Sequence, residues 1–545
     1  NWGSPDFFYS RRIGREPYGS VPSDADYEDY PSGTHIIGAA KLTGKIGGSW
    51  NFGTIQSLTK REYAGIQTDG VQSEAEVEPL AYYGVIRTQK EFDEGSQGIG
   101  IISTLSLRDF KDVRLVDEFN KSAITLGLDG WTFLDSSKTW VLAGWTGISH
   151  VSGNNQRMID LQRSSRHYFQ RPDASHVNVD STANSLTGFA GRFHLNKQKG
   201  NFFINSAFGF ITPGFEVNDL GFFFRGDVLN AHLGAGYKWT SPTNIYRELV
   251  LGGAVFRSYD FGGNITWQGL FHFGFMEFLN YYIADWDAAI YPETMNNSRT
   301  RGGPITLNPS SFSIGLFLRS DRRESWVVHL YGNTWQNGFS KFHGIGFGVE
   351  FRPVPNISFS VSPGYDWNYD YSQYIDTYED PTATNTYGKR YVFGELDQKI
   401  FSSNIRLNWI FNPSLSLQLY VQPLISTGKY VKYKELDMPG TYDFNNYGEG
   451  ESTFDEENLI ADPDGEGPAD EIDIGNNDYD FISLRGNAVL RWEYLPGSII
   501  YFVWTQSRTD EDETGNFLFG DSFNRMVSTQ PDNIFMVKFT YWFHM

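Results

Sequence analysis

The clearest pattern of candidate metal-binding residues lies between positions 462 and 473. Carboxylates fall at positions 1, 3, 5, 9 and 12 of this segment, with Gly467 at position 6. Calcium loops place oxygen ligands at such alternate positions and need a glycine at the sharp turn. The predicted Ca²⁺ ligands are Asp462, Asp464, Glu466, Asp470 and Asp473. No helices flank the segment, so the expectation is a bare calcium loop, and a metal-free acidic surface loop is the alternative.

A second candidate is the glycine- and phenylalanine-rich segment 211–225, which contains Glu216, Asn218 and Asp219. These side chains have the chemistry to contact a ligand. A loop that folds inward and narrows a lumen explains the composition better, and the short segment 300–304 is interpreted in the same way.

Three arginines near the start, Arg11, Arg12 and Arg15, form a third candidate. They are expected on the inner side of a strand. We favour a structural ladder, paired with lumen carboxylates such as Glu350, over a binding site.

The sequence gives little support for catalysis. Its ten histidines are scattered, and neither the metalloprotease spacing of two histidines nor the Gly-x-Ser-x-Gly elbow occurs. The prediction is that the chain is not an enzyme. A hydrolase whose catalytic residues meet only in the folded protein is kept as an alternative.

Composition limits which class of protein can hold these residues. The chain has 545 residues, a formal net charge of −21 and no cysteine. The negative charge argues against nucleic acid as a partner, because phosphates attract Lys and Arg. The absence of cysteine excludes disulfides and thiolate metal sites. The sequence starts at Asn1 with no signal segment, so we expect a mature or truncated chain.

Apolar and polar residues alternate along many segments. In residues 415–422, Leu or Val at odd positions alternates with Ser, Gln or Tyr at even positions. A strand with lipid on one side and a lumen on the other requires this period of two. Aromatic residues form 17% of the chain, which suits the girdles of a membrane barrel. No apolar stretch is long enough for a transmembrane helix.

A soluble β-sandwich is the main alternative. Arg485, Asn487, Arg491 and Glu493 share one strand face, whereas a sandwich would need a dry face there. A propeller and a solenoid are further alternatives, but no fixed internal repeat supports either of them. Short turns also alternate with long polar loops, as outer-membrane barrels show.

The sequence therefore predicts an all-β fold, a transmembrane antiparallel β-barrel of about 22 strands with long acidic extracellular loops. Residues 1–545 would form one barrel, with residues 436–480 as an acidic extracellular insertion. The closing strand would run from Ile534 to Phe543, and the first would pair with it. The predicted strands are 6–14, 34–44, 48–62, 80–92, 98–111, 121–133, 138–151, 183–196, 200–212, 224–241, 246–260, 263–276, 279–291, 306–319, 324–336, 340–352, 356–375, 387–411, 414–435, 480–495, 498–510 and 532–544.

The chain also resembles a family of uncharacterised Bacteroidota-type outer-membrane barrels. The resemblance runs end to end and rests on seven short motifs. These are FYSRRIGR at 8–15, GAAKLTGK at 38–45, PGFEVNDLGF at 213–222, TRGGP at 300–304, RYVF at 390–393, RWEY at 491–494 and PGS at 496–498. Members usually carry an N-terminal domain similar to carbohydrate-binding family 9, and no such module precedes Asn1 in this sequence.

The expected location is the outer membrane of a Gram-negative bacterium. The favoured function is a transporter or pore for a bulky solute, and the resemblance implies that this solute is glycan-derived. A scaffold subunit with a plugged lumen is the alternative. Expected partners are outer-membrane lipid and lipopolysaccharide, with partner chains or a missing N-terminal domain as further candidates and no nucleic acid.

Overall fold

The computed structural model describes residues 3–47 and 49–543. The chain divides into two compact units. The first comprises residues 1–236, 254–269 and 294–306, and the second comprises residues 237–253, 270–293 and 307–545.

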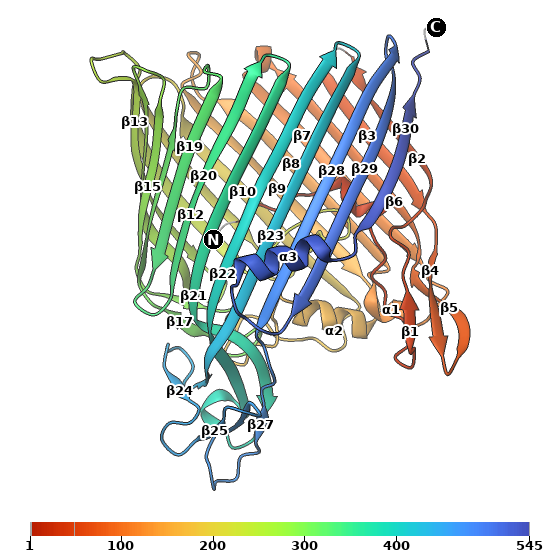
Figure 1. The fold of residues 1–545 in the computed structure, drawn as a ribbon, viewed down its shortest axis with the longest axis vertical. Helices are drawn as coiled ribbons and strands as arrows, with labels where there is room; N and C mark the ends of the chain where they lie inside the picture. The colour runs from red at the N-terminus through yellow and green to blue at the C-terminus, as the bar shows by residue number, and fades with distance from the viewer. Residues whose placement is uncertain (1–2, 48, 544–545) are drawn as a thin grey trace. The chain divides into compact units, whose positions relative to one another are not determined.

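Strands dominate both units, and helices are few and short (Figure 1). The strands up to β12 are β1 (Tyr27–Asp29), β2 (Ile36–Ile46), β3 (Trp50–Thr59), β4 (Glu62–Thr68), β5 (Val71–Glu78), β6 (Leu80–Phe92), β7 (Gln97–Asp109), β8 (Ser122–Phe133), β9 (Trp140–Ser152), β10 (Ser185–Lys197), β11 (Phe202–Ile211) and β12 (Val228–Trp239). The later strands are β13 (Tyr246–Tyr259), β14 (Ile265–Phe278), β15 (Ile283–Tyr291), β16 (Thr294–Asn296), β17 (Thr306–Asn308), β18 (Ser311–Arg319), β19 (Trp326–Gln336), β20 (Lys341–Val354), β21 (Ile357–Glu379), β22 (Lys389–Asn412), β23 (Leu415–Leu436), β24 (Phe444–Asn446), β25 (Thr453–Asp455), β26 (Ile460–Asp462), β27 (Ile472–Asp473), β28 (Tyr479–Leu495), β29 (Ser498–Asp512) and β30 (Asp532–Thr540). The helices are η1 (Ser10–Arg12), α1 (Leu115–Glu118), α2 (Asn155–Arg163), η2 (Asp93–Gly95), η3 (Thr384–Thr386) and α3 (Phe519–Ser528).

Twenty-two of these strands belong to one antiparallel sheet, which confirms the predicted number. One predicted member is wrong. Residues 6–14 form no strand of this sheet: η1 lies within them, and Asp6 makes an isolated bridge to Phe222. The three-residue strand β24, which pairs with β23, completes the count instead.

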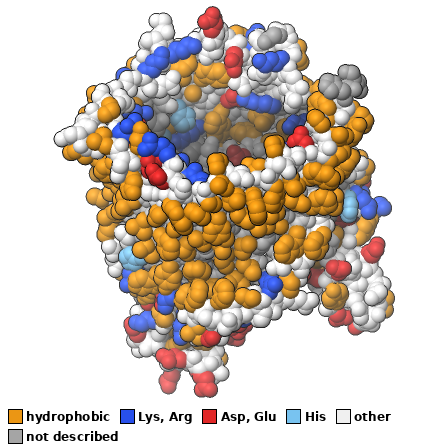
Figure 2. All heavy atoms as spheres, turned by 45° about the horizontal axis from the view of Figure 1, so that its top comes forward, with side chains coloured by type: hydrophobic (Ala, Val, Ile, Leu, Met, Phe, Trp, Pro, Cys, Tyr) orange, Lys and Arg blue, Asp and Glu red, His pale blue; other side chains and the backbone are white. Residues whose placement is uncertain are grey.

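The two faces of the sheet differ in exposure, as β8 of the first unit shows. Ile124 and Leu126 are each 46% exposed, whereas their neighbours Ala123 and Thr125 are buried. We call the face with exposed apolar residues the outer face and the opposite one the inner face. A soluble sheet would bury its apolar face against another layer, so this exposure is typical of a lipid-facing surface. Figure 2 shows apolar side chains gathered over the strands in view.

The described helices include none that is long and apolar enough to cross a membrane.

In the second unit, β21, β22 and β23 are unusually long, with 23, 24 and 22 residues. Their ends support the insertion 436–480, which contains β24 to β27 (Figure 1). Tyr433 of β23 and Val392 of β22 form a small core with Ala461 and Ile472 of the insertion. The acidic segment is therefore an ordered subdomain that shares an apolar core with β22 and β23.

The last strand, β30, pairs with β29 and ends at Thr540, earlier than the predicted Phe543. All nine of its residues are exposed. Every residue of β2, which pairs with β3, is exposed as well. The aromatic period of two in β30 is thus part of an exposed edge strand.

Candidate functional site: an arginine-lined cavity

Residues 212–227, which connect β11 to β12, lie against the inner face of the first unit. Phe215 is fully buried and belongs to one apolar cluster with Ala190 of β10. The backbone N–H of Glu216 donates to Ser149 Oγ of β9 at 2.8 Å. A Cβ at Gly188 of β10 would lie 2.1 Å from the backbone nitrogen of Phe215, so only glycine lets the loop approach this closely. We call residues 212–227 the inner loop, and its position agrees with the inward folding expected from the sequence.

A buried ion pair fastens the inner loop to the wall. Arg108 of β7 contacts Asp219 at 2.5 Å, and the two side chains are 2% and 7% exposed. The amide of Asn120 donates to the other carboxylate oxygen of Asp219 at 2.7 Å. A charge buried this deeply requires such partners, because removal from water is costly. Asp219, singled out from the sequence, therefore has a structural role.

Glu216 is held in a similar way. Its carboxylate accepts from Arg166 Nε at 3.1 Å and lies 3.3 Å from His167 Nε2, and it also accepts from the backbone N–H of Asn218. Burial acts to raise the pKa of Glu216, but the hydrogen bond from His167 and the charge of Arg166 outweigh it and lower the pKa to about 2. Glu216 is therefore ionised at neutral pH. It connects the inner loop to the loop between α2 and β10, which contains Arg166 and His167.

Residues 5–18, which we call the N-terminal segment, pack against the inner loop and the inner face as well. Phe7 packs edge-on against Trp145 and Phe215, with ring centroids 5.5 and 6.1 Å away. Asp6 and Phe222 exchange two backbone hydrogen bonds of 2.8 Å. Its apolar residues contact the inner face and the inner loop, which explains why the predicted strand 6–14 is wrong: the alternation there serves an internal contact and not a lipid-facing one.

A cavity of about 490 Å³ lies between the N-terminal segment, the inner loop and the segments that follow α1 and α2. Its charged lining residues are two carboxylates, Glu216 and Asp219, and five arginines. The arginines are Arg12, Arg15, Arg108, Arg157 and Arg166.

Two of these arginines have only neutral partners. Arg12 donates to the carbonyl of Gly221 at 3.1 Å and to Asn218 Oδ1 at 3.2 Å. Arg157 Nε donates to Asn120 Oδ1 at 2.8 Å. Across residues 3–47 and 49–543, neither guanidinium forms an ion pair. Arg12 thus departs from the expected ladder, because its partners are neutral, whereas Arg15 pairs with the carboxylate of Glu78 in β5 at 3.5 Å.

A second cavity of about 550 Å³ lies between the N-terminal segment and the inner face of strands β2 to β9. Its wall is apolar at Ile55, Val85 and Ile102. Close by, Arg87 Nη2 contacts Asp129 at 2.8 Å. An apolar wall beside a few polar groups is the usual construction of a small-molecule site.

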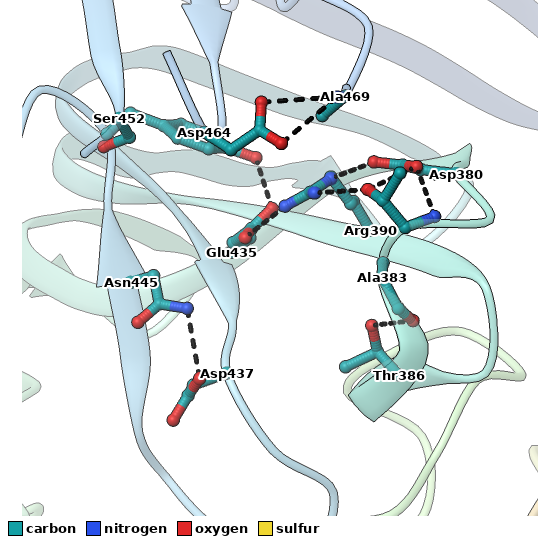
Figure 3. Close-up of polar contacts among 12 residues, drawn as sticks. Asp380, Ala383, Thr386, Arg390, Glu435, Asp437, Asn445, Ser452, Asp464 and Ala469 are labelled. Carbon is teal, nitrogen blue, oxygen red and sulfur yellow. Dashed lines mark hydrogen bonds and ion pairs between the residues drawn. The ribbon is translucent and has the colours of Figure 1, made fainter. Parts of the chain in front are cut away.

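The predicted calcium loop lies in the second unit and runs from the end of β26 to the end of β27. Figure 3 labels two of its residues, Asp464 and Ala469. Its aspartates serve local turns: Asp462 accepts from the N–H of Gly465 at 2.9 Å, and Asp464 accepts from that of Ala469. In the part of the chain that the structure describes, no three His, Asp or Glu side chains are grouped to hold a metal ion. Glu466 and Asp470 are exposed. Calcium binding at this loop stays a prediction.

Figure 3 also shows what holds the insertion in place. Arg390 of β22 donates to Asp380 at 2.5 Å and to Glu435 at 2.6 Å. The hydroxyl of Tyr447 donates to Glu435 at 3.0 Å. Burial raises the pKa of Tyr447 well above its usual value, so this hydroxyl stays a donor. The acidic subdomain is thus linked to the long strands through Tyr447, whose acceptor Glu435 is held in place by Arg390.

Sequence reasoning found Arg12, Arg15, Glu216 and Asp219 but missed the other arginines of the cavity. Arg108, Arg157 and Arg166 are isolated in the sequence and meet only through the fold. A local pattern carries no signal for such a set.

Over most of its length the chain is similar to several solved structures, three of which follow. The FrpB iron transporter from Neisseria meningitidis has 7% identity and a TM-score of 0.40, over 86% of this chain and 73% of that one. A ferric enterobactin receptor from Pseudomonas aeruginosa has 10% identity and a TM-score of 0.37, over 85% and 76%. The RagAB peptide importer has 11% identity and a TM-score of 0.38, over 92% and 64%. Likeness at this level does not extend to a substrate or mechanism, and no curated protein matches the chain.

The molecule's own strands determine its location. Antiparallel strands with an exposed apolar face are the architecture of outer-membrane proteins, and this protein belongs in the bacterial outer membrane. A family model covers residues 3–545, nearly the whole chain. The chain is a member of the family DUF5916, a domain of unknown function.

Proposed function

We propose that this protein is an outer-membrane transporter whose sheet closes into a barrel and whose passage is narrowed by the inner loop and the N-terminal segment. The observation that carries the proposal is the assembly on the inner face: two segments far apart in sequence enclose cavities there. A purely structural barrel could fill this space with side chains. Cavities lined by charged groups favour the passage of a solute.

Closure of the barrel would pair β30 with β2. Both are exposed along their whole length, and an unpaired exposed edge is unstable within a lipid bilayer because its backbone groups have no water to bind. Pairing these edges satisfies both sets of groups.

The solute proposed from the sequence is bulky and glycan-derived. The polar inner-face groups and the apolar wall of the second cavity support a molecule with both hydroxyl and apolar surfaces. The solute would contact Phe7 and the Arg87–Asp129 pair on its way past the N-terminal segment.

Flux into liposomes tests the proposal. The full chain is reconstituted, and the swelling rate is measured in glucose, sucrose and raffinose, with heat-denatured protein as the control. We expect swelling above the control that decreases with sugar size. Swelling equal to the control for all three sugars contradicts a transporter. A sealed barrel that copurifies with other chains would support the scaffold alternative.

A further inference from the structure

We propose that the arginine-lined cavity is a binding site for an anionic solute, a sugar-sized molecule that carries a carboxylate, phosphate or sulfate group. As an entry site the cavity rests on the proposed transport function, but binding itself can be measured without transport.

The charges around the cavity do not cancel. Asp219 and Glu216 are each engaged by an arginine of their own, Arg108 and Arg166. Arg12 and Arg157 remain with neutral partners only. A positive charge held away from bulk water attracts an anion more strongly than the same charge on a surface.

The energetic state of Arg12 supports this conclusion. Burial and the neighbouring charge of Arg15 lower the pKa of Arg12, which means that both factors disfavour its charged form. A bound anion would relieve this cost. Nε of Arg108 is also buried without a partner among the described residues, so an unused donor lies at the same cavity.

The donors come from separate elements. Arg12 belongs to the N-terminal segment, Arg108 to β7 and Arg157 to the first turn of α2. Guanidinium groups present paired N–H donors that match the oxygens of carboxylates and phosphates. The volume of about 490 Å³ lies within the range of small-molecule sites, and Phe222 and Phe224 add apolar wall.

The test measures binding by calorimetry with the full chain in detergent micelles. Glucuronate and glucose differ in a carboxylate and have nearly the same size, and glucose 6-phosphate adds a phosphate. We expect heat from glucuronate or glucose 6-phosphate and none from glucose. Arg12→Gln and Arg157→Gln should each weaken binding at least tenfold. The control is Arg11→Gln, an exposed neighbour outside the cavity.

Several results would overturn the site: no heat from either anion, equal heat from glucose, or unchanged binding in both variants. Unchanged hydrogen exchange in β8 shows that a variant is folded. A lipid phosphate is the other source of the same chemistry. If lipid A displaces glucose 6-phosphate while inorganic phosphate does not, the site recognises lipid and the solute proposal is wrong. Binding without liposome flux contradicts only the transport function, and flux without binding contradicts only this site.

A separate observation concerns α3, which covers part of the outer face of the second unit. Its contacts are with β23, β28 and β29, and Figure 1 shows it lying across these strands. Met526 of α3 is buried together with Ile425 of β23 and Ile482 of β28, which are register partners. Ile482 lies on the same strand face as the exposed Trp492, so α3 packs on the lipid-facing side.

The opposite face of α3 is apolar and exposed. Phe519, Phe523 and Val527 follow one another at intervals of four residues and are between 43% and 49% exposed. The spacing places them in one stripe. Polar contacts fix the other side: Arg525 pairs with Asp480 at 3.1 Å, and Arg508 donates to the carbonyl of Thr529 at the C-terminal end.

The geometry points to an in-plane membrane helix whose occupant is the acyl-chain region of the bilayer. The stripe continues the apolar outer face of the strands beneath it, while the ion pairs lie on the sheet side. Amphipathic helices with this arrangement lie at the boundary between headgroups and acyl chains.

Because the chain has no cysteine, single substitutions can carry a spin label without further changes. Labels at Phe523→Cys and at the exposed, non-stripe position Asn524→Cys are compared in liposomes. We expect the label at 523 to collide mainly with oxygen, which concentrates in lipid, and the label at 524 with a water-soluble nickel chelate. Equal nickel accessibility at both positions would overturn the inference.

Discussion

The contact between Arg108 and Asp219 should decide whether the inner loop stays on the wall. In Asp219→Asn the shape of the side chain is kept and its charge is lost. Arg108, which is 2% exposed, is then left buried without a counter-ion. Loss of one partner from a buried ion pair costs about 3–5 kcal/mol. If this cost destabilises the docked position of the inner loop, the fraction of molecules with the loop detached rises by about two to four orders of magnitude.

Hydrogen exchange measured by mass spectrometry is the assay. Peptides from the inner loop and from residues 5–9, which bond to it, should exchange faster by that factor, while β8 should be unchanged. In the double variant Arg108→Gln/Asp219→Asn no buried charge remains, so part of the protection should return. The control is Glu379→Gln, whose partner Lys389 forms an exposed ion pair worth under about 1 kcal/mol.

Unchanged exchange of the inner loop in Asp219→Asn would refute the reasoning. It would mean that the apolar contacts alone hold the loop. An equal increase in β8 would also refute it, because the substitution would then destabilise the wall itself.

Three further outcomes are expected. Gly188→Ala should displace the inner loop, because the new Cβ meets loop backbone at 2.1 Å, and its exchange should rise while Gly44→Ala, with open space around it, has no effect. Acid should release the same loop. The fold lowers the pKa of Glu216 to about 2 from an ordinary value of about 4.3. The stabilisation that ionised Glu216 gives the docked loop is therefore complete above about pH 5 and is lost as the pH falls toward 2. Glu216→Gln should remove this pH dependence of exchange. Arg390→Gln should expose residues 436–480 to protease, because Glu435, which accepts from Tyr447 of the subdomain, loses its partner. Protection of this subdomain by added Ca²⁺ would support the calcium prediction.

The sheet was predictable because a lipid-facing strand needs an apolar residue at every second position. That requirement is local and strong, and β6 begins and ends at the predicted residues. The same rule failed at residues 6–14. There Phe7 and its neighbours are apolar because they contact Trp145 and the inner loop, and the period alone does not distinguish an internal wall from lipid.

The candidate site was predictable only in part. Glu216 and Asp219 could be singled out because carboxylates are unexpected in a segment rich in Phe and Gly. Arg108 and Arg157 belong to different elements with no shared motif, and their approach depends on how α2 and the N-terminal segment lie on the inner face. Long-range placement of this kind follows from tertiary packing and leaves no local signal.

Single-channel conductance in planar bilayers tests the central claim most directly, because it reports both a membrane-spanning passage and its narrowing by the inner loop. The wild-type chain and Gly44→Ala should show the same small conductance. Gly188→Ala, which prevents the loop from docking, should show a conductance several-fold larger. A bilayer that remains sealed with all three proteins would contradict the account, and equal conductance in all three would show that the inner loop does not narrow the passage.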